Sequence, residues 1–528
     1  MILLYNARVY TSFKGSPVVN ALLIHEDRVL ATGSKDELSA IAPQGTARIN
    51  LEGKIVLPGM TDSHMHLKHY ALGLRSVLAE TETIEECLQR VANKAKEIPD
   101  GGWITGWGWN QNVWKGGFGN AAQLDAVSQG HPVCLSAKSG HAIWVNTLAL
   151  KMAGIDAHTP DPEGGVIQRD AKGNPTGILI ESAENLVSSL IPEPSHKELK
   201  DCMLAAQPSL WEMGLTGIHD FSSIDLFSVL QDMDQENSLG LRVVKGIPVH
   251  MLDHAAEIGL TSGFGSDFLK VGSIKVFMDG ALGPQTAGML EPFENSEDCG
   301  ILLLKADEVY EIGRKASSHG LSLAIHAIGD RANREVLDGY QMLRSFEREN
   351  GLKPQQHRIE HVQLLHPDDY SRLAQMNIIA SMQPIHATSD LFISDLYWGR
   401  RAAGAYAFRT LLTRNTRLIF GSDAPVETPN PFVGIHAAVT RRRIDGTPGE
   451  DGWYPAERLP LNEVLHAYTA APAISSGFGK RLGTLTSGSY ADLIVLNQDP
   501  FEIQAQNLHL LRPDATMVGG SWVWKKPG

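Results

Sequence analysis

Two histidines stand two positions apart in the segment Asp62-Ser63-His64-Met65-His66, directly after an apolar run with the pattern of a strand. Residues i and i+2 of an extended segment project to the same side, so His64 and His66 can present two imidazoles to one metal ion. An isolated pair of this kind is more often two ordinary histidines. The other ligands of a metal site must therefore be sought elsewhere in the chain.

Three more nitrogen or oxygen donors lie at the ends of later apolar runs. His326 ends LSLAIHA, His361 ends HRIEHV and Asp423 ends RLIFGSD. The intervals between them are 35 and 62 residues, or about one and two units of an α/β barrel, which takes roughly 31 residues per unit. Barrel active sites are built at the C-terminal ends of the strands. Five such donors predict a site for one or two divalent ions, with Zn²⁺ expected and Mn²⁺, Fe²⁺ or Co²⁺ also suited.

The elements that would position these residues repeat along the chain. Eight apolar runs alternate with helical stretches, which is typical of parallel βαβ units and predicts an α/β fold with a closed (β/α)8 TIM barrel. About 150 residues separate the first run from the second, so we expect an insertion of about 100 residues after barrel strand 1. The runs are VLPGMTDSH, LTGIHDF, LRVVKGI, VGSIKVFMD, LSLAIHA, HRIEHV, NIIASM and RLIFGSD.

Both ends of the chain have the pattern of short strands, and neither end is long enough to form a hydrophobic core alone. We expect the two ends to pair into one small β-sandwich domain. The insertion contains WITGWGWNQNVWKGGFG, which is too aromatic and too rich in glycine for a linker. The predicted domains are residues 1–57 with 480–528 for the β-sandwich, 58–100 with 195–479 for the metal-binding barrel, and 101–194 for the insertion.

Composition excludes several classes of function. The 528 residues include 60 acidic and 46 basic side chains, a formal net charge of −14. The one basic block, residues 441–443, is interpreted as a solvated helix face, so we expect no nucleic-acid partner. We expect no membrane partner either, because no run of 18 apolar residues occurs. The four cysteines form no CxxC pair and the first residues lack the features of a signal peptide, which favours a cytoplasmic location. A homo-oligomer is left open.

With these motifs in place, the chain resembles the amidohydrolase superfamily, in particular its YtcJ-like branch, which includes an N-substituted formamide deformylase. The resemblance covers nearly the whole chain. It is highly specific for the fold and the metal site and far less specific for the substrate. It rests on LPGMTDSHMH, GWGWNQ, SGHAIWVN, DPEGGVIQRD with NPTGILIE, IKVFMDGALG, HAIGDRA, RIEHVQLLHPDD, ASMQPIHATSD, GSDAPVETPNP and LTSGSYADLIVL.

The resemblance adds Lys275, which ends the fourth strand. In this superfamily a lysine at that place is often carboxylated by CO₂ on its ε-nitrogen, and the carbamate can bridge two metal ions. Burial next to metal ligands disfavours the ammonium form, and the neutral amine can capture CO₂. If Lys275 only pairs with a carboxylate such as Asp279, a single ion is expected. Two ions would divide the ligands, with one ion at His64, His66 and Asp423 and the other at His326 and His361.

These expectations describe a metal-dependent hydrolase that cleaves a non-peptide C–N bond of a small molecule with a metal-activated water. Asp423 would accept the proton of that water and pass it to the leaving nitrogen. His386, which ends the seventh strand, would bind the developing oxyanion or a substrate group, or else make a structural hydrogen bond. A deaminase or a cyclic-amide hydrolase on the same metal site stays open. A non-catalytic scaffold is disfavoured, because a scaffold has no use for the ligands.

Six residues receive predicted roles in substrate binding. Gln285 stands where the branch usually carries arginine, which favours a less anionic substrate. The loop after strand four is predicted to be extended, since 51 residues separate Lys275 from His326. Arg331 is predicted to orient a ligand or to hold a loop. In the branch the insertion covers the barrel mouth, although packing of the insertion's own core explains its aromatic residues equally well. The six residues are Trp107, Trp109, His141, Asp279, Gln285 and Arg331.

Overall fold

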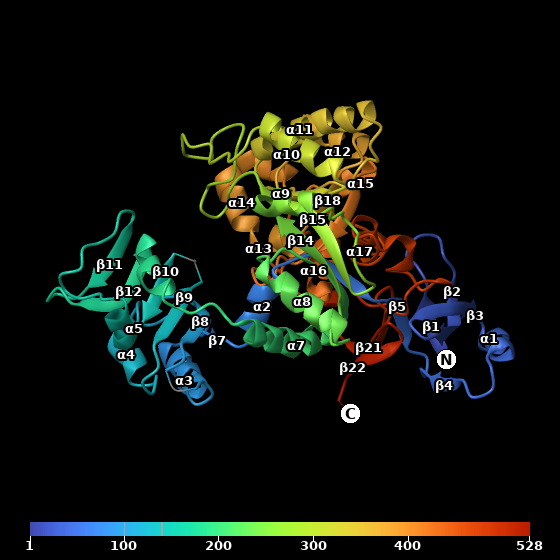
Figure 1. Cartoon of the computed structure of the whole chain (residues 1–528), viewed down its shortest axis with the longest axis horizontal. Helices are drawn as coiled ribbons and strands as arrows, with labels where there is room; N and C mark the ends of the chain where they lie inside the picture. Colours follow the sequence, from blue (N-terminus) through green and yellow to red (C-terminus); the bar gives the residue numbers. More distant parts are fainter. Residues whose placement is uncertain (100, 139–140, 528) are drawn as a thin grey trace. The chain divides into compact units, whose positions relative to one another are not determined.

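The computed structural model describes residues 1–99, 101–138 and 141–527 of the chain (Figure 1). It contains two compact units. The first comprises Met1–Lys68 together with Leu204–Gly528, and the second comprises His69–Met203.

Eight parallel strands of the first unit form a nearly closed barrel, which confirms the predicted fold class. Each strand pairs in parallel with the next, and each contains the centre of one predicted run. Burial is complete along β13 and β17, as expected for parallel strands covered on both faces. In barrel order the strands are β6 (Met60–Met65), β13 (Leu215–Asp220), β14 (Arg242–Pro248), β15 (Leu269–Phe277), β16 (Leu323–Ala327), β17 (Arg358–His361), β18 (Ile379–Met382) and β19 (Arg417–Phe420).

The barrel closes where its first strand meets the residues that follow its last strand. The His66 amide donates to the Ala424 carbonyl at 2.9 Å, and the Asp423 amide donates to the His64 carbonyl at 2.7 Å. These two bonds hold the backbone of the predicted HxH pair directly beside that of the predicted aspartate ligand. The hydrogen bonds that join the first strand to the residues after the last strand therefore also bring the predicted ligands together.

Helices connect the barrel strands. In α11 the residues Val336, Leu337, Tyr340 and Leu343 are buried at helical spacing, so one face packs inward. The connection from β15 to α10, residues 278–305, contains only turns and isolated bridges, which confirms the predicted extended loop. The helices are α7 (His196–Glu212), α8 (Asp225–Gln235), α9 (Leu252–Glu257), α10 (Ala306–Ser318), α11 (Asp330–Glu349), α12 (Arg372–Gln375), α13 (Pro384–Ser389), α14 (Leu391–Trp398), α15 (Phe408–Thr413), α16 (Pro431–Thr440) and α17 (Leu461–Tyr468).

The two ends of the chain pair with each other, as the strand pattern predicts, and their strands form one eight-stranded sheet. Antiparallel pairing of β5 with β20 joins the ends, and the blue and red strands lie together in Figure 1. Leu4, Val56, Leu493 and Met517 contribute to its core. The strands are β1 (Ile2–Tyr10), β2 (Val18–His25), β3 (Arg28–Gly33), β4 (Ala47–Asn50), β5 (Ile55–Pro58), β20 (Leu493–Leu496), β21 (Pro513–Val518) and β22 (Ser521–Lys525).

The second unit has a six-stranded sheet of its own, and its order is β11-β12-β10-β9-β8-β7. Its longest helix, α3 (Ile84–Ala95), begins after Thr83, whose hydroxyl accepts from the Glu86 amide and caps the helix. Among the described residues of the whole chain, no helix combines the length and the apolar character needed to span a bilayer. The strands are β7 (Val77–Leu78), β8 (Ile104–Trp109), β9 (Val133–Ala137), β10 (Ala142–Val145), β11 (Gly165–Arg169) and β12 (Pro175–Glu181), and the other principal helices are α4 (Ala121–Asp125) and α5 (Thr147–Met152).

Candidate metal centre

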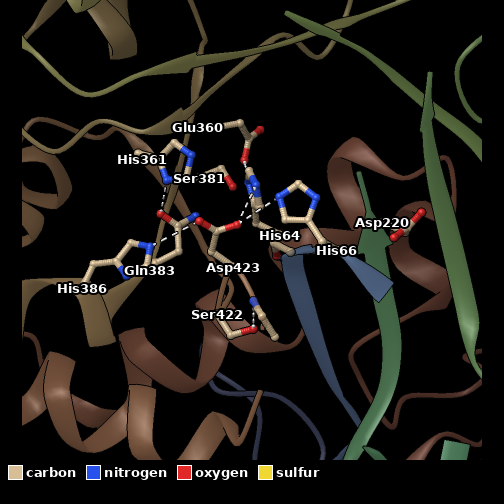
Figure 2. A network of polar contacts seen from close by, with 12 residues as sticks. His64, His66, Asp220, Glu360, His361, Ser381, Gln383, His386, Ser422 and Asp423 are labelled. Carbon is tan, nitrogen blue, oxygen red and sulfur yellow. Dashed lines mark hydrogen bonds and ion pairs between the residues drawn. The ribbon is translucent and has the colours of Figure 1, made fainter. Parts of the chain in front are cut away.

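Three predicted ligands from three different strand ends converge at the barrel mouth. His64 on β6, His361 at the end of β17 and Asp423 after β19 offer ligand atoms that all lie within 4.8 Å of one another. Figure 2 shows the Asp423 carboxylate at the centre of this group. The His64 and His361 side chains are buried, and the Asp423 side chain is 13% exposed. The parallel strand ends thus bring together residues as far apart as 64 and 423.

His66 joins the same carboxylate. The Nε2 atom of His66 lies 3.2 Å from Asp423 Oδ1, and Nε2 of His64 lies 3.4 Å from the same oxygen. The two imidazole rings, with centroids 5.7 Å apart, therefore both face Asp423 Oδ1.

His326 and Lys275 form the other side of the group. The His326 ring centroid lies 4.6 Å from that of His361. Lys275 is buried, and its Nζ lies 4.8 Å from the Phe221 ring centroid and 5.0 Å from that of Phe277. Burial lowers the pKa of Lys275 to about 8, against the opposing effect of nearby carboxylates.

Hydrogen bonds fix which nitrogen carries the proton in three of these imidazoles. His64 Nδ1 donates to Glu360 Oε2 at 2.6 Å, and His361 Nδ1 donates to Gln383 Oε1 at 2.8 Å. His326 Nε2 donates to the Gly280 carbonyl at 2.9 Å. Burial lowers the pKa of His64 and of His326 to about 4 and holds that of His361 well below its ordinary value. Each ring is therefore neutral, with one nitrogen lone pair left for another partner.

The contact between His64 and Asp423 tests whether these residues fit a cation. Burial opposes ionisation of Asp423, but the charged His386 ring beside it holds the pKa of its carboxyl well below the usual range. The lone pair of His64 Nε2 thus faces an anionic oxygen at 3.4 Å, and Asp423 Oδ1 is buried without a hydrogen bond among the described residues. His66 Nε2 lies 3.2 Å from the same oxygen, so three potential metal ligands meet at an oxygen that accepts no hydrogen bond from the described residues. Neutral imidazoles with a carboxylate fit Zn²⁺ or a similar divalent ion.

His386 holds the other carboxylate oxygen. It lies on α13, directly after β18, with Nε2 3.4 Å from Asp423 Oδ2 and Nδ1 3.7 Å from Glu427 Oε1. Burial opposes the charged ring, but the two carboxylates raise the pKa of His386 to about 10. His386 is therefore a cation, and its charged ring orients the Asp423 carboxylate.

Asp62 anchors the first strand to the last. Its Oδ1 accepts from the backbone amides of His64 and Ser422, each at 3.0 Å. Burial raises the pKa of Asp62 to about 7. The residue thus fixes the positions of the HxH segment and of the residue before Asp423.

The predicted substrate-binding residues of the first unit have different surroundings. The Asp279 carboxylate accepts from the backbone amides of Gly288, Ile328 and Gly329 at 2.8–3.0 Å, so it ties the loop after β15 to the start of α11. Because the Asp279 carboxylate is occupied by these backbone amides, the structure does not support its predicted contact with a substrate. Arg331 is exposed, and Gln285 is partly buried in a turn with φ 55°.

The three predicted residues of the insertion also differ from one another. Trp109 is 1% exposed in the core of the second unit, and its indole N–H donates to the Leu135 carbonyl at 2.7 Å. This packing fits the alternative in which the aromatic residues fill the insertion's own core. Trp107 is partly buried on β8, and the exposed His141 lies 3.2 Å from Glu181. A substrate contact of these two residues stays a prediction.

Several residues that shape the centre were missed in the sequence. Arg358 and Glu360, both on β17, form a buried ion pair, and Arg358 also bonds His219 Nδ1 at 2.8 Å and Ser381 Oγ at 2.8 Å. One signal was available, because two charged residues at i and i+2 of a strand buried on both faces must be paired. Gln383, the partner of His361, carries no such local signal.

Comparison with known proteins gives a consistent picture. Residues 47–524 match the model of the amidohydrolase family. The chain is 32% identical to Protein LONG AFTER FAR-RED 3 of Arabidopsis thaliana, over 99% of this chain and 91% of that protein. It is 31% identical to a Bacillus subtilis protein named as an amidohydrolase, YtcJ, over 98% of each. It is 27% identical to the N-substituted formamide deformylase of Arthrobacter pascens, over 100% of this chain and 99% of that protein.

Among solved structures, an uncharacterized metal-dependent hydrolase from Pyrococcus furiosus superposes with a TM-score of 0.79 at 30% sequence identity. The superposition covers 95% of this chain and 99% of that one. The likeness therefore extends over the barrel, the terminal sheet and the insertion.

Proposed function

The chain belongs to the amidohydrolase family, and from this premise we propose that it hydrolyses a non-peptide C–N bond of a small molecule with a divalent metal ion. The observation that carries the proposal is the contact between His64 Nε2 and Asp423 Oδ1 at 3.4 Å. Both atoms are acceptors, so neither donates a hydrogen bond to the other. The name of the Arthrobacter pascens relative supports an N-substituted formamide as one substrate class. A cytoplasmic location, a small-molecule substrate and Zn²⁺ as the metal belong to the same proposal.

The neutral imidazoles and the Asp423 carboxylate would hold the ion. A bound divalent ion supplies Lewis-acid chemistry, lowering the pKa of water from 15.7 to about 7 and polarising a carbonyl oxygen. The ligands proposed for one or two ions are His64, His66, Lys275, His326, His361 and Asp423.

Asp423 is proposed to move the proton. Its Oδ1 faces the imidazole nitrogens while its Oδ2 is held by the His386 cation, so the carboxylate has a fixed orientation. It would take a proton from the attacking water at Oδ1 and hand it to the leaving nitrogen. His386 would position Asp423 and offer a positive charge to a developing oxyanion.

Lys275 is proposed to carry a carbamate. Its neutral amine would attack the carbon of CO₂, forming an N–C bond and releasing one proton to solvent. The burial that lowers its pKa to about 8 supports this step. The ammonium form has competing contacts with the rings of Phe221 and Phe277. An intact mass of gently handled, metal-bound protein without the added CO₂ would exclude the carbamate.

The test combines metal content with turnover of a panel of N-substituted formamides, cyclic amides and exocyclic amines. Protein purified without chelator should contain one or two ions per chain, and Asp423→Asn should lose turnover by at least about 10²-fold, in line with loss of a general base. Asp368→Asn, at a side chain 81% exposed on the same unit, is the matched control and should keep full activity. A protein that takes up neither Zn²⁺ nor Mn²⁺, or an active Asp423→Asn variant, would contradict the proposal.

A further inference from the structure

Phe277 is an exposed aromatic side chain at the edge of the candidate metal centre. It is the last residue of β15, and it is 49% exposed although the other residues of that strand are buried. Lys275 and Phe277 are two positions apart, so they project to the same side of the strand. The Phe277 ring centroid lies 5.0 Å from Lys275 Nζ and 5.2 Å from the His326 ring centroid. The ring therefore stands beside the ligands and is open to solvent.

A second aromatic ring lines the same group from another strand. Phe221, which follows β13, lies 4.7 Å from the His64 ring and 4.8 Å from Lys275 Nζ. Its position is set by its amide, which donates to the Met65 carbonyl at 2.8 Å, and by Gly246. A Cβ atom on Gly246 would approach the Phe221 ring to 2.5 Å, so this glycine leaves the room that the ring occupies.

A third apolar side chain follows Asp423. Val426 is 64% exposed, and its amide donates to the Asp423 carbonyl at 3.0 Å, which places it one turn from the carboxylate. The segments that carry the predicted metal ligands thus expose Phe277 and Val426, with the partly buried Phe221 beside His64 and Lys275. Such exposed apolar surface next to a polar site is typical of a ligand-binding surface.

The chemistry of these side chains selects what can lie against them. A phenyl face gains from contact with another ring or with alkyl groups, and a negatively charged group placed there would lose hydration without a partner, while a positively charged group would lie beside the proposed divalent ion. We infer that the site takes amides whose substituent next to the scissile bond is uncharged and aromatic, and that Phe277 is the specificity-determining residue. This inference rests on the proposed metal-dependent function.

Binding of two small hydroxamates tests the inference without requiring turnover. Acetohydroxamate and benzohydroxamate carry the same metal-binding group, and they differ in a methyl against a phenyl substituent. Titration calorimetry on the metal-loaded full chain should show benzohydroxamate binding about tenfold more tightly. Phe277→Ala should reduce this ratio to within about twofold while acetohydroxamate affinity stays unchanged. Phe277→Trp, which restores an aromatic face, should recover most of the preference.

Phe264→Ala is the matched control, because Phe264 is 65% exposed on the same unit but precedes β15, at the opposite end of that strand from Lys275 and Phe277. It should leave both affinities unchanged. Equal affinities of the two hydroxamates for the native chain, or a preference that survives Phe277→Ala, would overturn the inference. A preference that follows Phe277 in a protein that hydrolyses none of the amides would instead overturn the proposed hydrolysis alone. Failure of both hydroxamates to bind the metal-loaded protein would overturn the metal centre and this inference together.

Discussion

Replacing Glu360 with glutamine should weaken metal binding at the candidate centre, although Glu360 is not itself a predicted ligand. Its fully buried carboxylate accepts from His64 Nδ1 at 2.6 Å and from Arg358 Nη2 at 2.9 Å. Burial opposes its ionisation, but Arg358 and His64 hold the pKa of this carboxyl well below its usual range. The negative charge keeps the proton of His64 on Nδ1, which leaves Nε2 as the nitrogen that faces Asp423.

Two losses follow from the substitution. Glutamine keeps the shape of the side chain but leaves the Arg358 guanidinium, itself 2% exposed, without its charged partner. Removing one partner of a buried ion pair lowers stability by about 3–5 kcal/mol. Loss of a carboxylate that orients a metal-binding histidine lowers metal affinity by about 10- to 100-fold, which is about 1.4–2.8 kcal/mol of binding free energy.

The chain offers a matched control for this experiment. Glu347 is also buried between an arginine and a histidine, with Arg344 Nη1 at 2.6 Å and His357 Nε2 at 3.1 Å, but neither partner is a predicted ligand. Zn²⁺ affinity, measured by competition with a chromophoric chelator, should fall in Glu360→Gln and stay native in Glu347→Gln. Urea midpoints of the metal-free proteins should fall in both variants. Equal Zn²⁺ affinity in the two variants would refute the reasoning.

Gly421→Ala would place a Cβ atom 2.4 Å from the His64 amide nitrogen, so the backbone must shift. Elemental analysis should then find less metal per chain. A native metal content would show that the centre tolerates the shift. Burial alone would raise the pKa of Glu347, but His357 helps to lower it to about 2, from an ordinary value of 4.5. The ionised carboxylate therefore stabilises the fold above about pH 4.5, and this contribution is lost as the pH falls towards 2. Urea midpoints across that window should depend less steeply on pH in Glu347→Gln; equal slopes would count against the assignment. Trp109→Phe removes the indole hydrogen bond and should lower the free energy of unfolding by about 1 kcal/mol without changing benzohydroxamate affinity. A changed affinity would instead support the predicted role of Trp109 in substrate binding.

The barrel could be predicted because its local pattern carries most of the information. Each strand is a short apolar run, buried on both faces, and several runs end abruptly in a histidine or an aspartate. His326, His361 and Asp423 stand out for this reason, since a polar residue at the C-terminal end of a barrel strand lies at the mouth. The terminal sheet follows from the same logic, because strands such as β1 and β20 cannot bury their apolar faces alone.

Residues whose role depends on a distant partner could not be predicted in the same way. His64 and Glu360 are 296 positions apart, and nothing near either residue in sequence indicates that they meet. Asp279 was predicted to bind a substrate, yet its carboxylate accepts hydrogen bonds from backbone amides of two later segments. A backbone amide has no sequence signature, so a carboxylate that holds a loop and one that binds a ligand look alike.

The partners of the histidines bear on the choice between an enzyme and a scaffold more directly than the ligand set does. A ligand set can persist in a barrel that has lost its metal, because buried imidazoles can simply pack. Here His64, His326 and His361 each use one nitrogen on an acceptor, Glu360, the Gly280 carbonyl or Gln383. In the case of His64 the lone pair that remains is directed at an anionic carboxylate. That contact is repulsive without a cation and favourable with one, so it gives a protein that never binds metal no advantage.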